Sequence, residues 1–115
     1  MDAELRRRLE QSGYGRSGFA EHYDRFRPRP PLALRELLPP LAGVDRPSLV
    51  VDLGCGTGLS TRFWAERADE VVGVEPNEAM RTFAEQATDT SNVRYLGASS
   101  YETGLPDACA DLVTA

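Results

Sequence analysis

Runs rich in apolar residues, separated by polar and helix-forming stretches, organise the second half of the chain. Such runs occupy residues 49–53, 71–74 and 93–96, and a further one begins at 110. Each has the length of a buried strand. The stretches at 59–67 and 80–87 instead repeat apolar residues at helical spacing. Strands that alternate with helices predict an α/β fold built on a parallel sheet.

The first 46 residues predict helices and loops rather than strands. Residues 2–11 favour a short polar helix, and a loop rich in Gly and Ser follows at 12–18. Aromatic residues within 19–29 are spaced to form one apolar helical face. Within 30–40, three leucines share one helical face. We expect prolines to open this covering helix at 30–31 and to stop it at 39–40.

The composition is that of one small domain with an acidic second half. The chain has 115 residues, 41% hydrophobic and 27% charged, and a formal net charge of -5. Residues 1–46 hold nine Arg against seven acidic residues, whereas residues 47–115 hold four Arg against eleven. This acidity argues against nucleic acid as a partner, because phosphates and carboxylates repel one another.

Neither the cysteines nor the hydropathy indicate a metal site, secretion or membrane insertion. Cys55 and Cys109 lie 54 residues apart, without the spacing of a zinc site or a disulfide framework. No apolar stretch reaches the length of a signal-peptide core or a membrane span. We therefore expect no bound metal, no membrane partner and a cytoplasmic location.

A glycine turn between the first strand and the following helix carries the candidate chemistry. Residues 51–58 read Val-Asp-Leu-Gly-Cys-Gly-Thr-Gly, with Gly54, Gly56 and Gly58 at alternate positions. Glycines bring bare main chain close to a ligand, and the first turn of a helix attracts negative charge. A dinucleotide-binding turn spaces its glycines as GxGxxG, and a pyrophosphate beside Asp52 would place like charges together. The pattern therefore favours a ligand with both a cationic and an anionic end.

A second acidic residue, Glu75, follows the next apolar run and stands 21 residues after Gly54. An acidic residue at the end of the second strand, at about this separation, reaches the ribose of a bound nucleotide. A carboxylate accepts from both ribose hydroxyls at once. The ligand predicted from these residues therefore contains a ribose and is a nucleoside.

These two features together resemble the first two motifs of class I methyltransferases that use S-adenosylmethionine. The acidic residue before the glycines, the glycine spacing, and Glu75 at its distance carry the resemblance. S-adenosylmethionine joins a zwitterionic amino acid to adenosine through a sulfonium, so it meets the charge requirement. The resemblance implies a Rossmann-like, doubly wound α/β fold with strand order 3-2-1-4, and in-line methyl transfer to a small-molecule acceptor. It implies that the enzyme mainly aligns its two reactants, and we assign no catalytic side chain.

The resemblance also implies further contacts to the cofactor. Tyr23 and Arg27, ahead of the first core helix, resemble a lid segment over the methionine end of the cofactor. Residues just after the ribose-binding acid often touch adenine, although Met80 fits core packing equally well. The family's usual acidic residue after the third strand is missing, and Ser99, Ser100 or a backbone carbonyl would replace it. The implied cofactor-binding residues are Asp52, Gly54, Cys55, Gly56, Gly58, Glu75, Pro76, Asn77, Met80, Ser99, Tyr23 and Arg27.

The family pattern continues beyond the fourth strand with three further strands that this sequence lacks. We therefore expect a fold truncated after the fourth strand, with a lid and covering helices in residues 1–46 and an incomplete cofactor-binding core in residues 47–115. Such a chain would be half of a longer enzyme or be completed by another chain, and its unpaired strand edge could pair in a homo-oligomer. Two other functions stay open: a noncatalytic S-adenosylmethionine-binding or interaction module, and a nicotinamide-dependent oxidoreductase.

Overall fold

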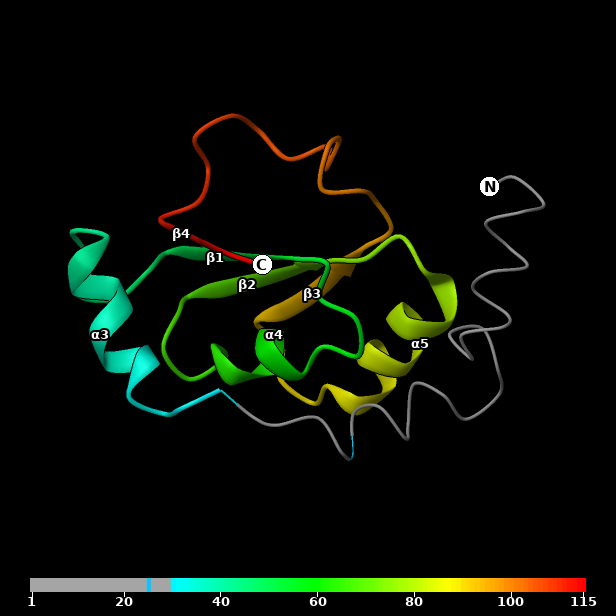
Figure 1. Ribbon diagram of the computed structural model, residues 1–115, viewed down its shortest axis with the longest axis horizontal. Coiled ribbons are helices and arrows are strands. Elements are labelled where there is room, and N and C mark those ends of the chain that lie inside the picture. Colours follow the sequence, from blue (N-terminus) through cyan, green and yellow to red (C-terminus); the bar gives the residue numbers. More distant parts are fainter. Residues whose placement is uncertain (1–24, 26–29) are drawn as a thin grey trace.

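The protein, seen in a computed structural model that describes residue 25 and residues 30–115, is built on a four-stranded parallel sheet (Figure 1). The strands are β1 (Leu49–Leu53), β2 (Glu70–Val74), β3 (Val93–Leu96) and β4 (Leu112–Thr114). They lie in the order β3-β2-β1-β4, and every neighbouring pair is parallel. The predicted α/β fold and strand order are therefore confirmed. The elements predicted within 2–24 and 26–29 lie outside the described residues.

The two central strands are rich in valine, as is typical of parallel strands with both faces covered. Val50, Val71 and Val72 are fully buried, and Val51 is nearly so. In the register of β1 on β2, the last residue of one strand lies beside the last residue of the other. The residues that follow the two strands therefore meet at one edge of the sheet, the carboxyl edge.

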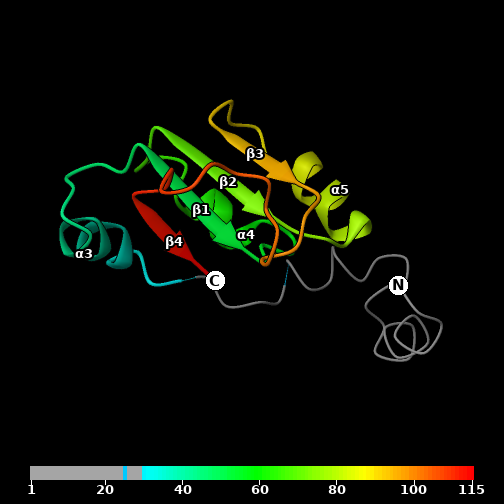
Figure 2. The same ribbon diagram turned by 90° about the horizontal axis from the view of Figure 1, so that it is seen from above.

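Helices α4 (Leu59–Phe63) and α5 (Glu78–Ala87) cover one face of the sheet, and the loop between β3 and β4 crosses the other (Figure 1, Figure 2). Both helices lie on the same face because right-handed crossovers lead from β1 to β2 and onward to β3 in one direction. Alternate strand residues point to opposite faces, so each face has its own apolar cluster. The helix-side cluster is Val50, Trp64, Ala68 and Val71, and the loop-side cluster is Val51, Val72 and Val74.

Helix α4 is shorter than the helix predicted at 59–67. It ends at Phe63, and several of the following main-chain N–H groups bond three residues back in tight turns. A distant side chain takes one of the carbonyls in these turns, since Asn92 Nδ2 donates to the Ala65 carbonyl at 2.7 Å. The turns place Trp64, which is 2% exposed, in the core. Tertiary contacts therefore outweigh the helical spacing of this stretch.

Helix α3 (Leu34–Leu41) continues through Pro39 and Pro40, so the expectation that these prolines stop it is wrong. The fixed φ of proline is itself helical. Proline destabilises a helix interior because a main-chain hydrogen bond is lost and because its ring clashes with an earlier carbonyl. Pro39 is buried, which favours keeping it in the helix. The helix ends instead before Gly43, which has a φ of 80°.

Of the helices in the described part of the chain, none has the length and apolar character needed to span a lipid bilayer.

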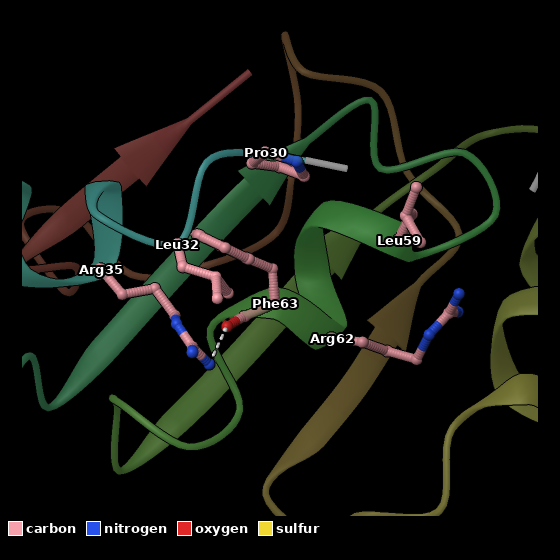
Figure 3. A pocket seen from close by; sticks show the side chains of 6 residues that line it. All are labelled: Pro30, Leu32, Arg35, Leu59, Arg62 and Phe63. Carbon is pink, nitrogen blue, oxygen red and sulfur yellow. Dashed lines mark hydrogen bonds between the residues drawn. The ribbon is translucent and has the colours of Figure 1, made fainter. Parts of the chain in front are cut away.

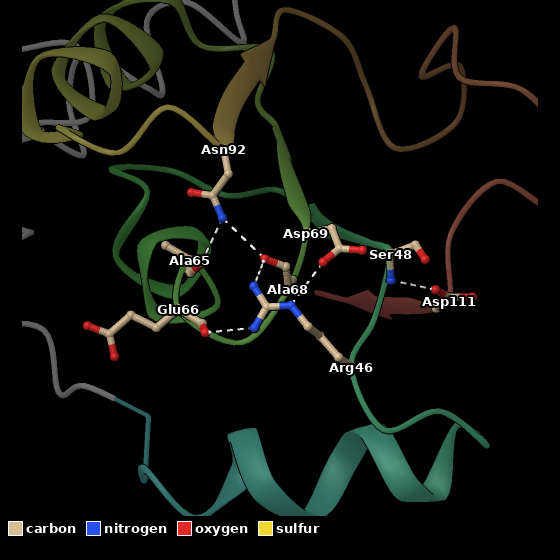
Figure 4. A network of polar contacts seen from close by, with 8 residues as sticks. All are labelled: Arg46, Ser48, Ala65, Glu66, Ala68, Asp69, Asn92 and Asp111. Atoms are coloured by element: carbon tan, nitrogen blue, oxygen red, sulfur yellow. Dashed lines mark hydrogen bonds and ion pairs between the residues drawn. The ribbon is translucent and has the colours of Figure 1, made fainter.

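Polar contacts around Arg46 tie together the amino ends of the strands (Figure 4). Its Nε donates to Asp69 Oδ1 at 2.9 Å and its Nη2 to the Ala68 carbonyl at 2.8 Å. The Ser48 N–H donates to Asp111 Oδ2 at 2.7 Å, which joins the start of β1 to the residue before β4. The network lies at the end of the sheet opposite the carboxyl edge, so it holds the strands in place while leaving that edge open.

Strand β4 forms one edge of the sheet and is shorter than the run predicted at 110–115. Among the described strands it pairs only with β1. Val113 on this strand is 55% exposed. Pairing of this edge in a homo-oligomer stays a prediction.

Candidate functional site

The turn between β1 and α4 brings three glycines to the carboxyl edge of the sheet. Gly54, Gly56 and Gly58 have φ angles of 64°, 56° and 82°, in the left-handed region that glycine reaches without steric cost. The Cys55 N–H donates to the Val74 carbonyl at 3.0 Å, which anchors the turn on the end of β2. The main chain therefore makes a narrow bend, and any residue other than glycine at these three positions would strain the backbone.

The two sides of this bend differ in what surrounds them. Apart from its two neighbours in the chain, no described residue lies within 4 Å of a Cβ added to Gly56. A Cβ added to Gly58 would collide with the Tyr95 hydroxyl and would lie 3.0 Å from the Ala84 Cβ. The Gly56 side is therefore open to a ligand, whereas the Gly58 side packs against the protein.

Glu75 connects the end of β2 to the glycine turn. It is 7% exposed, and its Oε1 accepts from the Gly56 N–H at 2.9 Å. Its Oε2 accepts from the Asn77 N–H, also at 2.9 Å. Each carboxylate oxygen has a second lone pair, so the group can still accept hydrogen bonds from a ligand while it holds the main chain of the turn.

Asp52 is buried beneath the same edge and is 3% exposed. Its Oδ2 accepts from the Thr61 hydroxyl of α4 at 2.8 Å, and its Oδ1 accepts from the Thr114 hydroxyl of β4 at 2.9 Å. A small cavity of about 40 Å³ adjoins this carboxylate and is lined by Asp52, Gly54, Cys55, Thr57, Leu59, Ser60 and Ala115. The cavity therefore has an acidic wall, which suits the cationic end of the ligand predicted from the sequence.

Pro76 and Asn77 continue the edge after Glu75. The Asn77 side chain accepts from the Met80 N–H at 3.0 Å, so Asn77 is the N-cap of α5. Pro76 is exposed. The Asn77 N–H also donates to the Glu75 carboxylate, and direct contact of Pro76 or Asn77 with a ligand stays a prediction.

The other described residues predicted to contact the cofactor, Met80 and Ser99, do not lie at the glycine turn or directly after Glu75. Met80 is fully buried on the inner side of α5, which fits its packing interpretation, and contact with a ligand would require this side chain to become accessible. Ser99 lies half-buried in the loop after β3, and its carbonyl accepts from the Glu102 N–H at 3.3 Å. Tyr23 and Arg27 lie outside the described residues.

Cys55, within the turn, carries a buried thiol near two carboxylates. Burial, followed by the negative charges of Asp52 and Glu75, raises the pKa of the Cys55 thiol from its ordinary value of 9.0 to about 12. A thiolate is the reactive form of cysteine, so Cys55 is neutral and inert at physiological pH. The Cys55 side chain packs beside Gly73 of β2, and its contact with a cofactor stays a prediction.

We expect a thiol reagent such as dithionitrobenzoate to modify Cys109 rapidly and Cys55 hardly at all in the folded protein at about pH 8. Cys55 is 8% exposed, whereas Cys109 is half-buried. Absorbance should therefore report one fast thiol per chain, and two after denaturation. A Cys109→Ser variant should have no fast thiol, and rapid reaction of that variant would contradict the burial of Cys55.

A larger cavity of about 380 Å³ lies along the outer side of α4 (Figure 3). Arg62 Nη1 donates to the Thr57 carbonyl at 2.7 Å, and Arg35 Nη1 reaches the Phe63 carbonyl at 3.4 Å. Leu59 lines this cavity and the small cavity at Asp52, so the two spaces share a wall at the start of α4. The volume suits a small molecule. Its described lining is Pro30, Leu32, Arg35, Leu59, Arg62 and Phe63.

Three contributors to the site escaped prediction from the sequence. The hydroxyl of Thr114, which bonds Asp52, stands 62 residues after it, and no local pattern links the two. Thr61 also bonds Asp52 and follows it by nine residues, in the helix after the turn. Its place in that helix was the one feature of the sequence that could have indicated this contact. Tyr95, beneath Gly58, looks like an ordinary strand residue in the sequence.

Comparison with known proteins identifies the family. Residues 51–115, more than half of the chain, match the family model described as a methyltransferase domain. A probable S-adenosylmethionine-dependent methyltransferase from Saccharomyces cerevisiae is 40% identical over 68 residues, which are 59% of this chain and 23% of that protein. A Dictyostelium discoideum relative is 31% identical over 70 residues, which are 61% of this chain and 26% of that protein. The chain thus spans about a quarter of the length of these curated relatives.

Solved structures agree with this assignment. A structure described as a type II methyltransferase, from Anaeromyxobacter dehalogenans, has a TM-score of 0.65 and 36% identity, over 76% of this chain and 35% of that chain. A structure described as an S-adenosylmethionine dependent methyltransferase, from Listeria monocytogenes, has a TM-score of 0.54 and 30% identity, over 57% of this chain and 30% of that chain. The chain belongs to the methyltransferase domain family, within the class I S-adenosylmethionine-dependent methyltransferases.

Proposed function

We propose that this chain binds S-adenosylmethionine at the carboxyl edge of β1 and β2 and acts in methyl transfer to a small-molecule acceptor. The observation that carries the proposal is the meeting of three groups at this edge. They are the open main chain at Gly56, the Glu75 carboxylate 2.9 Å from the Gly56 N–H, and the Asp52 carboxylate at the adjoining cavity.

Each group has its own part in binding. Glu75 would accept hydrogen bonds from the ribose hydroxyls with its remaining lone pairs. Asp52 would attract the ammonium of the methionine part, which would lie at the cavity that this carboxylate lines. Pro76 and Asn77 would border the adenine ring, and Ser99 would offer a polar contact in place of the family's usual acidic residue.

The acceptor would lie beside α4. When bound, S-adenosylmethionine supplies an electrophilic methyl group on its sulfonium, so the main task of the protein is to keep the two reactants close and aligned. The cavity of about 380 Å³ shares Leu59 with the cavity at Asp52, which supports an acceptor position next to the cofactor. Its lining by Leu32 and Phe63 fits a small organic molecule with an apolar part.

The proposal extends to the rest of the chain. Residues 1–46, with Tyr23 and Arg27, would supply the lid and covering helices, and residues 47–115 the cofactor-binding core. Both cysteines are free, which fits a reducing compartment, and we propose the cytoplasm as the location. Because the chain spans about a quarter of its curated relatives, the activity and acceptor of the whole enzyme belong to this proposal as well.

Calorimetric titration with S-adenosylhomocysteine, and in parallel with NADH, tests the cofactor assignment. We expect saturable binding of S-adenosylhomocysteine and no binding of NADH, because a pyrophosphate near Asp52 would meet like charge. Binding of NADH alone would overturn the proposal in favour of a nicotinamide-dependent oxidoreductase.

Transfer is tested separately, with methyl-labelled S-adenosylmethionine and a panel of small organic acceptors that present O, N, S and C nucleophiles. We expect label in at least one acceptor and none without protein. Cofactor binding with no transfer to any acceptor would instead favour a noncatalytic S-adenosylmethionine-binding module.

A further inference from the structure

Tyr95, on β3, fills the space beneath the glycine turn. It pairs in register with Gly73 of β2, and a Cβ added to Gly73 would lie 2.7 Å from Tyr95 Cδ1. A Cβ added to Gly58 would collide with the hydroxyl end of the same side chain. The ring thus occupies the volume left free by two missing side chains, one in the sheet and one in the turn.

A second residue holds the Tyr95 hydroxyl in place. The hydroxyls of Tyr95 and Thr88 lie 2.7 Å apart, and Thr88 Oγ1 donates to the Ala84 carbonyl, also at 2.7 Å. A threonine hydroxyl has one hydrogen to donate, so Tyr95 is the donor in its bond to Thr88. Tyr95 therefore links the C-terminal end of α5 to the underside of the turn.

The phenol remains in its neutral, donating form. Burial raises the pKa of the Tyr95 hydroxyl above its ordinary value of 10.0, against a smaller lowering by Thr88 and Arg62. Arg62 in turn donates to the Thr57 carbonyl at 2.7 Å. The residues on either side of the Thr57–Gly58 peptide are therefore held by side chains from α4 and β3.

The Tyr95 ring adds to the other contacts on this side of the turn, among them the bond from Arg62 to the Thr57 carbonyl. Helix α4 has five residues, and its N-cap is Gly58, which has no side chain with which to cap the helix. Helices this short are marginal without packing. Glycines at positive φ also have more conformational freedom than other residues, so a fixed ring against Gly58 restricts the torsions that set the position of Gly56.

We propose that Tyr95 is a positioning residue for the cofactor. Its ring, anchored through Thr88, holds Gly58 and the start of α4 so that the open side of the turn, at Gly56, keeps the geometry in which it binds the ligand. This inference rests on the proposed function, in which that turn holds the cofactor. Tyr95 lies beneath the turn and acts through the main chain.

Hydrogen exchange of the ligand-free protein tests the role in the turn. Tyr95→Phe removes the hydroxyl alone, and Tyr95→Leu removes the outer half of the ring. Val93→Ala is the control, because Val93 lies on the same strand and packs on the helix-side cluster at the opposite end from the turn. We expect both Tyr95 variants to speed exchange within 54–58 more than within 49–53, and Val93→Ala to affect the two segments alike.

Calorimetric titration with S-adenosylhomocysteine tests the consequence for binding. Tyr95→Phe should weaken affinity about 3- to 10-fold, the effect expected for one hydrogen bond, and Tyr95→Leu should weaken it further. Val93→Ala should keep wild-type affinity. If the Tyr95 variants match Val93→Ala in both measurements at equal loss of thermal stability, Tyr95 is a packing residue only and the inference is overturned. If wild-type protein does not bind, the proposed function fails, while exchange still decides whether Tyr95 holds the turn.

Discussion

Gly56→Val is expected to abolish binding of S-adenosylhomocysteine while the chain remains folded. In the described part of the chain, no residue beyond the two chain neighbours lies within 4 Å of a Cβ at this position, so the side chain would project into the space proposed for the ligand. The substitution also strains a backbone with a φ of 56°, at a cost of roughly 1 to 3 kcal/mol of folding free energy. Calorimetric titration measures the loss of binding, and thermal unfolding measures the strain.

Gly43→Val is the control for Gly56→Val. It separates the effect of a side chain in the ligand's space from the effect of backbone strain. Gly43 has a φ of 80°, and no described residue beyond its chain neighbours lies within 4 Å of a Cβ added to it, but it follows α3 rather than β1. It should lose comparable stability and keep wild-type affinity. Normal binding by Gly56→Val would place the ligand elsewhere. Loss of binding by Gly43→Val as well would attribute the effect to strain alone.

Gly58→Ala should affect folding more than Gly56→Val does, although alanine is the smaller side chain. Its Cβ would collide with the Tyr95 hydroxyl, which Thr88 holds, and would approach the Ala84 Cβ to 3.0 Å. We therefore expect a lower midpoint of thermal unfolding for Gly58→Ala than for Gly56→Val. The reverse order would contradict the packed inner side of the turn.

Glu75→Ala is expected to weaken binding of S-adenosylhomocysteine by about 1.5 to 3 kcal/mol, the range for hydrogen bonds to a charged group. The change would remove the proposed acceptor of the ribose hydroxyls. It would also release the Gly56 and Asn77 N–H groups, which the carboxylate holds at 2.9 Å each. Calorimetric titration of wild type and variant gives the difference directly.

Glu75→Gln should lose nearly as much affinity as Glu75→Ala, although glutamine has the same shape as glutamate. One oxygen becomes an amide that donates, and it would face a main-chain N–H that also donates, at either Gly56 or Asn77. Glu78→Gln is the matched control, since Glu78 is an exposed residue in the first turn of α5. Wild-type affinity of Glu75→Gln would show that two accepting oxygens are unnecessary.

Strands could be predicted more accurately than helix ends, for a physical reason. The buried runs of β1 and β2 are rich in apolar residues and bounded by turn residues, so the pattern lies within a few neighbours. The ends of α3 and α4 depend on partners that no local window contains. Asn92 takes the Ala65 carbonyl after α4, and the burial of Pro39 favours keeping it within α3.

The candidate site divides in the same way. Glu75 and the glycine turn could be placed together from the sequence, because parallel strands in register end at one edge. The role of Met80 could not be decided, because its helical spacing fits a core residue and a ligand contact alike. Its complete burial followed from the packing of α5 on the sheet.

The sequence by itself determined the class of fold, and it also predicted the edge for ligand binding and the chemical type of the ligand. Those properties rest on hydrophobic period, turn residues and the order of charges, all of which act between near neighbours along the chain. The tertiary structure alone decided how the site is held. Thr114 reaches Asp52 across 62 residues, and Tyr95 supports Gly58 from another strand. Such contacts depend on which side chains the packed sheet and helices bring within a few ångströms, and that is a property of the assembled core rather than of any one segment.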